Sequence, residues 1–318
     1  MNKDQDILKV GLAQMAPIWL DRDKTLEKVS AFIENAAEQN CELVVFGEAL
    51  VPGYPFWVER TDGARFNSEL QKEIFAHYLK QGVQIEAGHL NNVCRLAKEK
   101  KITVVIGIVE RAPDRGGHSM YCTLVYIGND GQIKHTHRKL MPTYEERLVW
   151  SIGDGNGLQV QSLKNFTTGA LNCYENWMPL SRAALYGQGE DLHIALWPGS
   201  KHNTENITRF IAQESRSFVI SVSGLMRKTD VPNYIPHADI ILENSKETLA
   251  NGGSCLANPT GKWIIEPQIN SEGIFAAEID FGQVRQERQN FDLAGHYSRP
   301  DVTKLIINRE RQSIVFIK

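Results

Sequence analysis

Segments typical of β-strands alternate with segments typical of α-helices along most of this chain, and this alternation constrains its fold more than any other feature. Residues 102–109 form an apolar run of strand length, whereas Leu26, Val29 and Ile33 recur at the spacing that lines one face of a helix. Some neighbouring strands are joined by short turns instead, and Asn129-Asp130-Gly131 predicts one such hairpin. This mixture of connections predicts an α/β sandwich with mixed sheets rather than a purely parallel, doubly wound fold.

The same patterns predict where the elements lie and how the chain is divided. We expect strands at residues 9–16, 42–46, 102–109, 120–127, 132–140, 158–162, 168–172, 192–197, 218–223, 254–258 and 273–279. We expect helices at residues 26–37, 68–79, 89–99, 179–187 and 203–217. No linker rich in Pro or Ser, low-complexity tract or block of like charges divides the chain. We therefore expect one domain over residues 1–318, in which residues 301–318 form a C-terminal tail.

Charge and hydropathy exclude several classes of protein. The 318 residues include 35 Lys and Arg against 38 Asp and Glu, a formal net charge of −3, so the chain lacks the basic excess that nucleic acid or an anionic membrane surface requires. No apolar run reaches the roughly 18 residues of a membrane-spanning helix, and the first residues do not resemble a signal peptide. We therefore expect a soluble, cytoplasmic protein that binds neither nucleic acid nor a membrane.

One of the cysteines is a candidate nucleophile. The odd number and scattered spacing of the cysteines argue against a disulfide framework and against a zinc site. They are Cys41, Cys94, Cys122, Cys173 and Cys255. Four of them are expected to be packing residues, but Cys173 follows a short apolar strand and precedes a helix that we expect to begin near Pro179. On such a turn, backbone N–H groups and the positive end of the helix are expected to lower the pKa of the thiol.

Two further segments carry charged groups that could assist this thiol. Glu48 stands just past the end of the apolar strand at residues 42–46, and ligands of α/β proteins gather beyond the carboxyl ends of strands. Lys139 is followed by apolar residues and a proline, so its ammonium turns inward and needs a carboxylate such as Glu146 or Glu48. A histidine could also act as the base for Cys173, since the chain contains nine histidines.

Together these segments resemble the nitrilase superfamily of carbon–nitrogen hydrolases, with its Glu-Lys-Cys triad. The resemblance extends from residues 9–16 to Gly295-His296-Tyr297-Ser298-Arg299-Pro300, over nearly the whole chain. Its most specific part, residues 137–155, is similar to the true nitrilase branch rather than to the amidase branches, as are Cys173-Tyr174-Glu175-Asn176-Trp177 and Trp197-Pro198-Gly199. The position after the cysteine, Tyr174, departs from the Trp or Gly often found there, which leaves the preferred substrate size open.

The resemblance implies a fold, a reaction and a set of roles. The fold would be a four-layer α-β-β-α sandwich, and the reaction would convert an organic nitrile to the carboxylic acid and ammonia through a thioimidate and a thioester on Cys173. Glu48 would be the general base, and Lys139 would stabilise the developing charge with help from the backbone N–H of Tyr174. Glu146 would fix Lys139 and help to position the substrate. The walls of the substrate pocket would be Tyr54, Trp150, Tyr174 and Trp177, and the reaction would need no cofactor and no metal.

Other activities share parts of this pattern. An amidase of the same superfamily, acting on a small amide, would use the same triad, and a cyanide hydratase would stop at the amide. A non-catalytic scaffold would use the fold alone, but Glu48, Lys139 and Cys173 are all present. The sequence does not distinguish aliphatic, arylaliphatic and aromatic nitriles as substrates.

The resemblance also implies self-association. The helix after Cys173 and the helix around residues 203–217 would form the dimer face, and the tail at residues 301–318 would take part in subunit contacts. We expect a homodimer or a larger homo-oligomer whose other partner is a small nitrile.

Overall fold

The computed structural model describes residues 5–315, whose strands form two sheets. The first has the order β13-β1-β2-β3-β4-β5, and the second has the order β10-β11-β9-β8-β7-β6, with β12 paired to β11. The strands of the first sheet are β1 (Ile7–Gln14), β2 (Leu43–Phe46), β3 (Thr103–Arg111), β4 (Met120–Ile127), β5 (Ile133–Arg138) and β13 (Gly273–Asp280). Those of the second are β6 (Gln161–Leu163), β7 (Phe166–Asn172), β8 (Leu192–Trp197), β9 (Phe218–Ser223), β10 (Leu225–Arg227), β11 (Thr248–Ala257) and β12 (Trp263–Ile269). Both sheets are mixed, since β1-β2-β3 and β7-β8-β9 are parallel and their outer neighbours are antiparallel.

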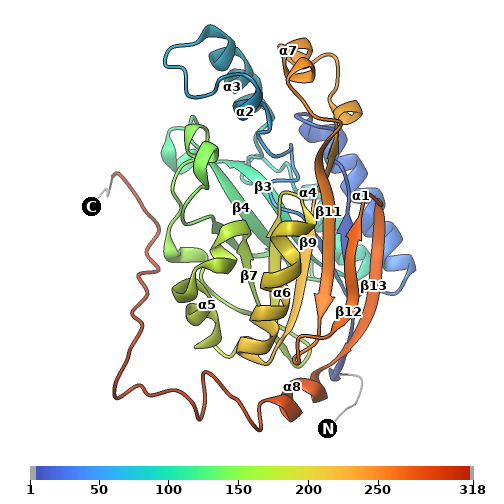
Figure 1. Cartoon of the computed structure of the whole chain (residues 1–318), viewed down its shortest axis with the longest axis vertical. Coiled ribbons are helices and arrows are strands. Elements are labelled where there is room, and N and C mark those ends of the chain that lie inside the picture. Colours follow the sequence, from blue (N-terminus) through green and yellow to red (C-terminus); the bar gives the residue numbers. More distant parts are fainter. Residues whose placement is uncertain (1–4, 316–318) are drawn as a thin grey trace.

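Helices cover the outer face of each sheet (Figure 1). The α-helices are α1 (Arg22–Glu38), α2 (Trp57–Arg60), α3 (Glu69–Gln81), α4 (Asn91–Lys100), α5 (Pro179–Tyr186), α6 (Lys201–Ser215), α7 (Ala238–Glu243) and α8 (Phe281–Glu287). The short 3-10 helices are η2 (Pro113–Arg115), η3 (Tyr144–Leu148), η4 (Gly155–Gly157), η5 (Cys173–Trp177) and η6 (Lys228–Asp230). Within residues 5–315, no helix combines the length and the apolar character needed to cross a membrane. Because α1 and α4 pack on the first sheet and α5 and α6 on the second, the expected four-layer α-β-β-α sandwich is confirmed.

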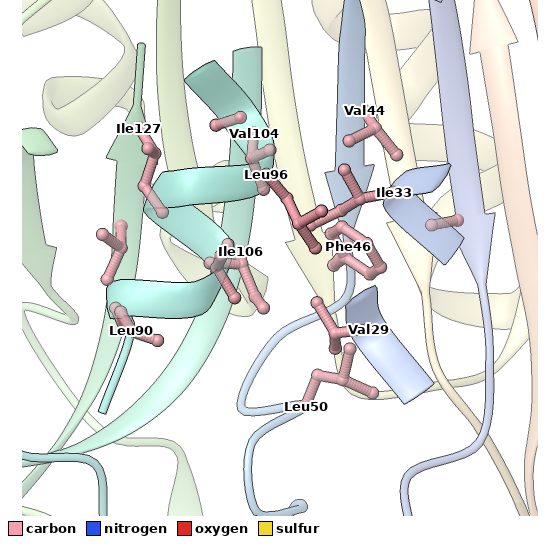
Figure 2. Close-up of a cluster of buried hydrophobic side chains, with 14 of the residues drawn as sticks. Val29, Ile33, Val44, Phe46, Leu50, Leu90, Leu96, Val104, Ile106 and Ile127 are labelled. Carbon is pink, nitrogen blue, oxygen red and sulfur yellow. The ribbon is translucent and has the colours of Figure 1, made fainter. Parts of the chain in front are cut away.

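Strand β2 shows how the sequence produces these layers. Successive side chains of a strand point to opposite faces, so Val44 and Phe46 join the cluster under the helices of the first sheet, while Leu43 and Val45 join the cluster between the two sheets. Figure 2 shows the outer cluster, where Ile33 of α1 lies beside Phe46. A strand buried on both faces needs apolar residues throughout, which explains the continuous apolar run seen in the sequence.

The expected elements differ from the structure mainly in short or exposed segments. The strand expected at residues 158–162 is β6, which begins only at Gln161. Strand β12 was not expected, because it contains Pro267 and its residues are only half-buried or exposed, as suits a strand near an edge. The helices α2, α7 and α8 have 4, 6 and 7 residues, too few for a helical period to show in the sequence.

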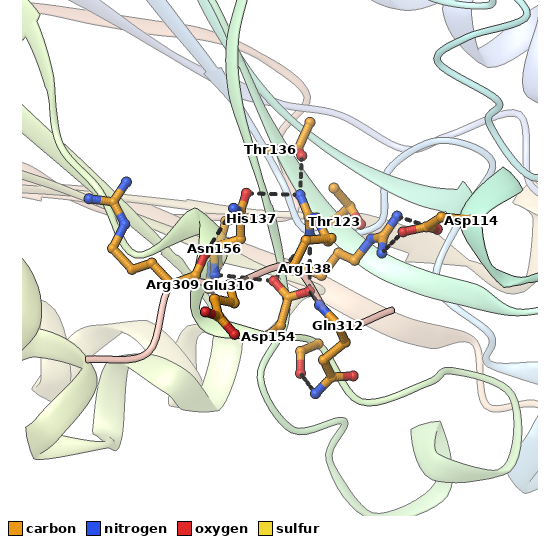
Figure 3. A network of polar contacts seen from close by, with 12 residues as sticks. Asp114, Thr123, Thr136, His137, Arg138, Asp154, Asn156, Arg309, Glu310 and Gln312 are labelled. Carbon is orange, nitrogen blue, oxygen red and sulfur yellow. Dashed lines mark hydrogen bonds and ion pairs between the residues drawn. The ribbon is translucent and has the colours of Figure 1, made fainter. Parts of the chain in front are cut away.

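After α8 the chain runs along the outside of the sandwich, and residues 288–315 contain neither helix nor strand (Figure 1). Near its end, the Arg311 guanidinium pairs with Asp154 at 3.1 Å and donates to Asn156 Oδ1 at 3.1 Å. The backbone N–H of Gln312 donates to the same aspartate at 3.0 Å, and Figure 3 shows this polar network. The tail thereby contacts η4 and the residue before it, and its part in subunit contacts stays a prediction.

Candidate active site

Glu48 lies where the ends of the two sheets meet. Its backbone N–H donates to the carbonyl oxygen of Trp197 at 3.1 Å, which links the chain after β2 to the end of β8 in the other sheet. On the opposite side, β3 approaches so closely that a Cβ on Gly107 would lie 2.3 Å from the carbonyl oxygen of Gly47, so only glycine leaves room there. Contacts from both sheets therefore fix the backbone of Glu48 at the carboxyl ends of their parallel strands.

Lys139 follows β5 and lies between two carboxylates. Its Nζ is 2.9 Å from Glu48 Oε1 and 2.7 Å from Glu146 Oε2, and all three side chains are at most 1% exposed. Burying an ammonium group without partners of opposite charge would cost several kcal/mol. The carboxylates of Glu48 and Glu146 are such partners. Because two contacts occupy at most two of its three N–H groups, one remains for a reacting atom.

Glu146 is the more firmly held of the two carboxylates. It lies in η3, where its Oε2 accepts the backbone N–H of Thr143 at 2.6 Å and completes a capping box. Its Oε1 accepts the hydroxyl of Tyr54 at 2.9 Å. With Lys139 as the third donor, both oxygens of Glu146 are occupied, so its charge serves to hold the lysine in place.

Cys173 directly follows strand β7, on a sharp turn at which η5 begins. Its φ is +47°, a left-handed conformation that is strained for a residue other than glycine and that resembles the turns on which hydrolases present their nucleophiles. A carboxylate oxygen of Glu48, one of Glu146 and the Cys173 sulfur all lie within 4.8 Å of one another. Residues from three separate segments of the chain thus lie close together.

The expectation of a lowered pKa for Cys173 is wrong. Burial, and then the negative charge of Glu48, raise the pKa of this thiol well above its usual value, although Lys139 and a hydrogen bond from the backbone N–H of Tyr174 oppose the change. The helix α5 does not help, because η5 separates its first turn from the sulfur. The thiol is therefore protonated at neutral pH and needs a base before it can attack.

Glu48 has the properties of that base. Burial raises the pKa of Glu48 to about 7, with the positive charge of Lys139 acting in the opposite direction. A carboxyl group that titrates near neutral pH can both take up and release a proton there. Its Oε1 accepts hydrogen bonds, whereas Oε2 is buried without a hydrogen-bond partner among the described residues.

Oxygen and sulfur atoms this close together are also donors of the kind that bind metals. A metal ion bound by Glu48, Glu146 and Cys173 would lie beside the Lys139 ammonium and be repelled by it. Lys139 already supplies the positive charge between the carboxylates. The cluster is therefore better suited to acid–base chemistry than to binding a metal ion.

The four residues expected to line the substrate pocket divide into two pairs. Tyr54 and Trp150 pack edge to face with their ring centroids 5.5 Å apart, and the Lys139 ammonium lies 5.8 Å from the Trp150 ring. Tyr174 and Trp177 lie in η5 together with Cys173, but they are 57% and 42% exposed. Trp150 is thus buried and Tyr54 half-buried close to Lys139 and Glu146, and the contacts of all four with a substrate stay predictions.

Glu175 was given no role from the sequence, yet it connects the two halves of the site. Its carboxylate accepts the backbone N–H of Leu140, at 2.7 Å, and that of Asn172, at 2.9 Å. The ring of His137 lies 3.0 Å from both of its oxygens. Burial alone would raise the pKa of Glu175, but His137 and the two backbone donors lower it. The spacing of Asn172 and Glu175, which is that of a capping box, was the available signal.

Comparison with known proteins assigns the chain to a family. The model of the carbon-nitrogen hydrolases matches residues 9–289. Nitrilase 2 of an unknown prokaryotic organism is 35% identical over 309 residues, which cover 96% of this chain and 95% of that protein. An aliphatic nitrilase of Sinorhizobium fredii (strain HH103) is 33% identical over 313 residues, which cover 96% and 97%. The structure of Saccharomyces cerevisiae Nit3, a member of branch 10 of the nitrilase superfamily, shares the fold with a TM-score of 0.69 at 21% identity, over 92% of this chain and 97% of that one. As its motifs indicated, the chain therefore belongs to the carbon–nitrogen hydrolases of the nitrilase superfamily, in the nitrilase branch.

Proposed function

We propose that this enzyme is a nitrilase that hydrolyses an organic nitrile to the carboxylic acid and ammonia, with Cys173 as its nucleophile. The observation that carries the proposal is the position of the Lys139 ammonium, which contacts Glu48 at 2.9 Å and Glu146 at 2.7 Å beside the Cys173 thiol. This arrangement combines a nucleophile, a base and a cation within one buried cluster. The names of the nitrilase relatives support nitriles as the substrate class.

The first step forms a covalent thioimidate. Glu48 accepts the proton of the Cys173 thiol while the sulfur attacks the nitrile carbon, and one of the carbon–nitrogen π bonds breaks. The electron pair moves to the nitrogen, which receives the proton from Glu48 and thereby becomes the imine N–H. The free N–H of Lys139 and the backbone N–H of Tyr174 would stabilise the negative charge that develops on the nitrogen.

Two water molecules then complete the reaction. Glu48 takes a proton from the first water, whose oxygen adds to the thioimidate carbon, and passes it to the nitrogen, which becomes an amino group. Glu48 then moves the proton of the new hydroxyl group to this nitrogen, the carbon–nitrogen bond breaks, and ammonia leaves as the carbonyl of the thioester forms. The remaining thioester is attacked by the second water, which releases the carboxylic acid and returns the proton to the Cys173 sulfur. A group that gives and takes protons repeatedly works best with a pKa near the working pH, and the pKa of about 7 of Glu48 meets this requirement.

The test is the release of ammonia and of acid from a panel of aliphatic, arylaliphatic and aromatic nitriles, with the corresponding amides as paired substrates. Cys173→Ala is expected to release no ammonia while keeping the circular dichroism spectrum of the wild type. Mass spectrometry of the products separates the three activities: acid from nitriles indicates a nitrilase, amide from nitriles a hydratase, and acid from amides alone an amidase. Normal turnover by Cys173→Ala would refute the assignment of the nucleophile.

The proposal extends to assembly and location. Leu180 of α5 and Phe210 of α6 are 69% and 49% exposed on the helices that would form the dimer face, so pairing of two copies would cover apolar surface. Light scattering during size-exclusion chromatography is expected to give at least twice the mass of one chain, and Leu180→Glu to lower it. A cytoplasmic location is supported by the five cysteines, which are all free.

A further inference from the structure

Cys122 is a buried thiol that the proposed reaction does not use, and it touches the proposed base. It lies in β4, is 1% exposed, and its Sγ is 3.3 Å from Glu48 Oε1, to which it donates. Its neighbour in the strand, Thr123, faces the other way and donates to Glu110. Packing alone would need only an apolar group at this position, so the donor has to be explained separately.

The two carboxylate oxygens of Glu48 differ in their contacts. Oε1 forms an ion pair with the Lys139 ammonium at 2.9 Å and accepts a hydrogen bond from the Cys122 thiol at 3.3 Å. Oε2 is buried, and no hydrogen-bond partner for it lies among the described residues. Both contacts lie on the same oxygen, so they restrict rotation of the carboxyl group and leave the lone pairs of the other oxygen free.

We propose that Cys122 is a positioning residue of the proposed reaction: by donating to Oε1 of Glu48, it holds the carboxylate so that Oε2 accepts the proton of Cys173. This inference rests on the proposed role of Glu48 as the base. Lys139 alone could hold Oε1, but its ammonium must also respond to the charge that develops on the substrate. A second donor on the same oxygen keeps the carboxylate oriented during that change.

The loss of this donor should change the pKa of Glu48 in a predictable direction. A hydrogen bond to the ionised form of a carboxyl group lowers its pKa, so removing the Cys122 thiol raises the pKa of Glu48 further above the value of about 7. The other charged or titratable groups around Glu48 are Lys139, Glu146, Cys173, Tyr54 and Tyr78. All of them remain in a Cys122 variant, so a shift can be attributed to the thiol. Because a thiol is a weak donor, we expect a shift of about half a pH unit, or about threefold in rate below the midpoint.

The experiment compares the pH dependence of two rates in Cys122→Ala, Cys122→Val and Cys122→Ser. The first rate is kcat/KM for ammonia release from a nitrile that the wild type converts. The second is the alkylation of Cys173 by iodoacetamide, followed by peptide mass spectrometry, which needs no nitrile. The control is Cys255→Ala, which also removes a fully buried thiol, one that contacts Thr208 rather than Glu48.

The alanine and valine variants are expected to move the acid limb of both profiles upward, while the serine variant, whose hydroxyl restores a donor, and Cys255→Ala keep it in place. The valine variant decides the matter if the alanine variant does not fold. Unshifted profiles in both donor-free variants would overturn the proposal, and so would a serine variant shifted as far as alanine. If the wild type converts no nitrile, the proposed function fails, and the alkylation profile alone decides on Cys122.

Discussion

Replacing Glu175 by glutamine should both destabilise the protein and weaken the link between the two halves of the candidate active site. The carboxylate accepts N–H groups from Leu140 at one oxygen and from Asn172 at the other. A glutamine side chain has a single acceptor oxygen, so its NH₂ group must face one of these two donors. The variant therefore leaves a buried backbone N–H without an acceptor and removes the charge beside His137.

The expected magnitude follows from these lost contacts. An unsatisfied buried N–H costs about 1–3 kcal/mol, and a hydrogen bond to a charged acceptor contributes about 1.5–3 kcal/mol. We expect Glu175→Gln to lower the free energy of unfolding by about 3 kcal/mol, less than the roughly 5–15 kcal/mol of a typical domain, so that it still folds. The variant also weakens the connection, through Leu140 and Asn172, between the backbone next to Lys139 and the backbone next to Cys173. Because the two groups are then less well positioned, kcat should fall by about 10²-fold.

Urea denaturation at pH 7, followed by circular dichroism, measures the first quantity. Glu99→Gln is the matched control, because it removes an exposed carboxylate that pairs with Arg95 on the surface of α4, where such pairs contribute about 0–1 kcal/mol. The folded protein lowers the pKa of Glu175, so its stabilisation is full above the unfolded pKa of about 4.3 and is lost as the pH falls through the folded value. The difference between wild type and variant should therefore shrink in acid. A variant within about 0.5 kcal/mol of the wild type at pH 7, or a difference independent of pH, would refute this reasoning.

Three further predictions concern single groups. The kcat/KM of the wild type for a nitrile should rise with pH through about 7, because Glu48 must be ionised to accept the thiol proton and burial raises its pKa to that value; a limb centred near pH 4 would contradict this. Tyr54→Phe removes one donor to Glu146 and should lower kcat/KM about tenfold, whereas Tyr234→Phe, which loses an exposed hydroxyl contact to Asp21, should leave it unchanged. Arg311→Ala should speed the removal of the tail by chymotrypsin, since it cuts the contacts to Asp154 and Asn156; equal cleavage rates in variant and wild type would show that other contacts hold the tail.

Much of the architecture could be predicted from local patterns. The hydrophobic period of a strand or helix depends on residues only a few positions apart, so the continuous apolar run of β2 and the helical spacing of α1 were visible in the chain itself. The elements that were missed have weak local signals, as in β12 with its Pro267 and in the four-residue helix α2. Chemistry could be anticipated in the same way where a reactive group stands directly after a strand, as Glu48 and Cys173 do.

What surrounds those groups depended on the tertiary structure. The sequence suggested a lowered pKa for Cys173 from its place on a turn, but burial and the carboxylate of Glu48 raise it, and both arise from residues far away in the chain. The donation from Cys122 to Glu48 and the tie of Glu175 to Leu140 likewise join segments with no local relation. The sequence by itself determined which elements form and which side chains can react, because those properties belong to short segments. Only the tertiary structure decided the charge state, the orientation and the partners of the reactive groups, because desolvation and hydrogen bonding depend on every segment packed around them.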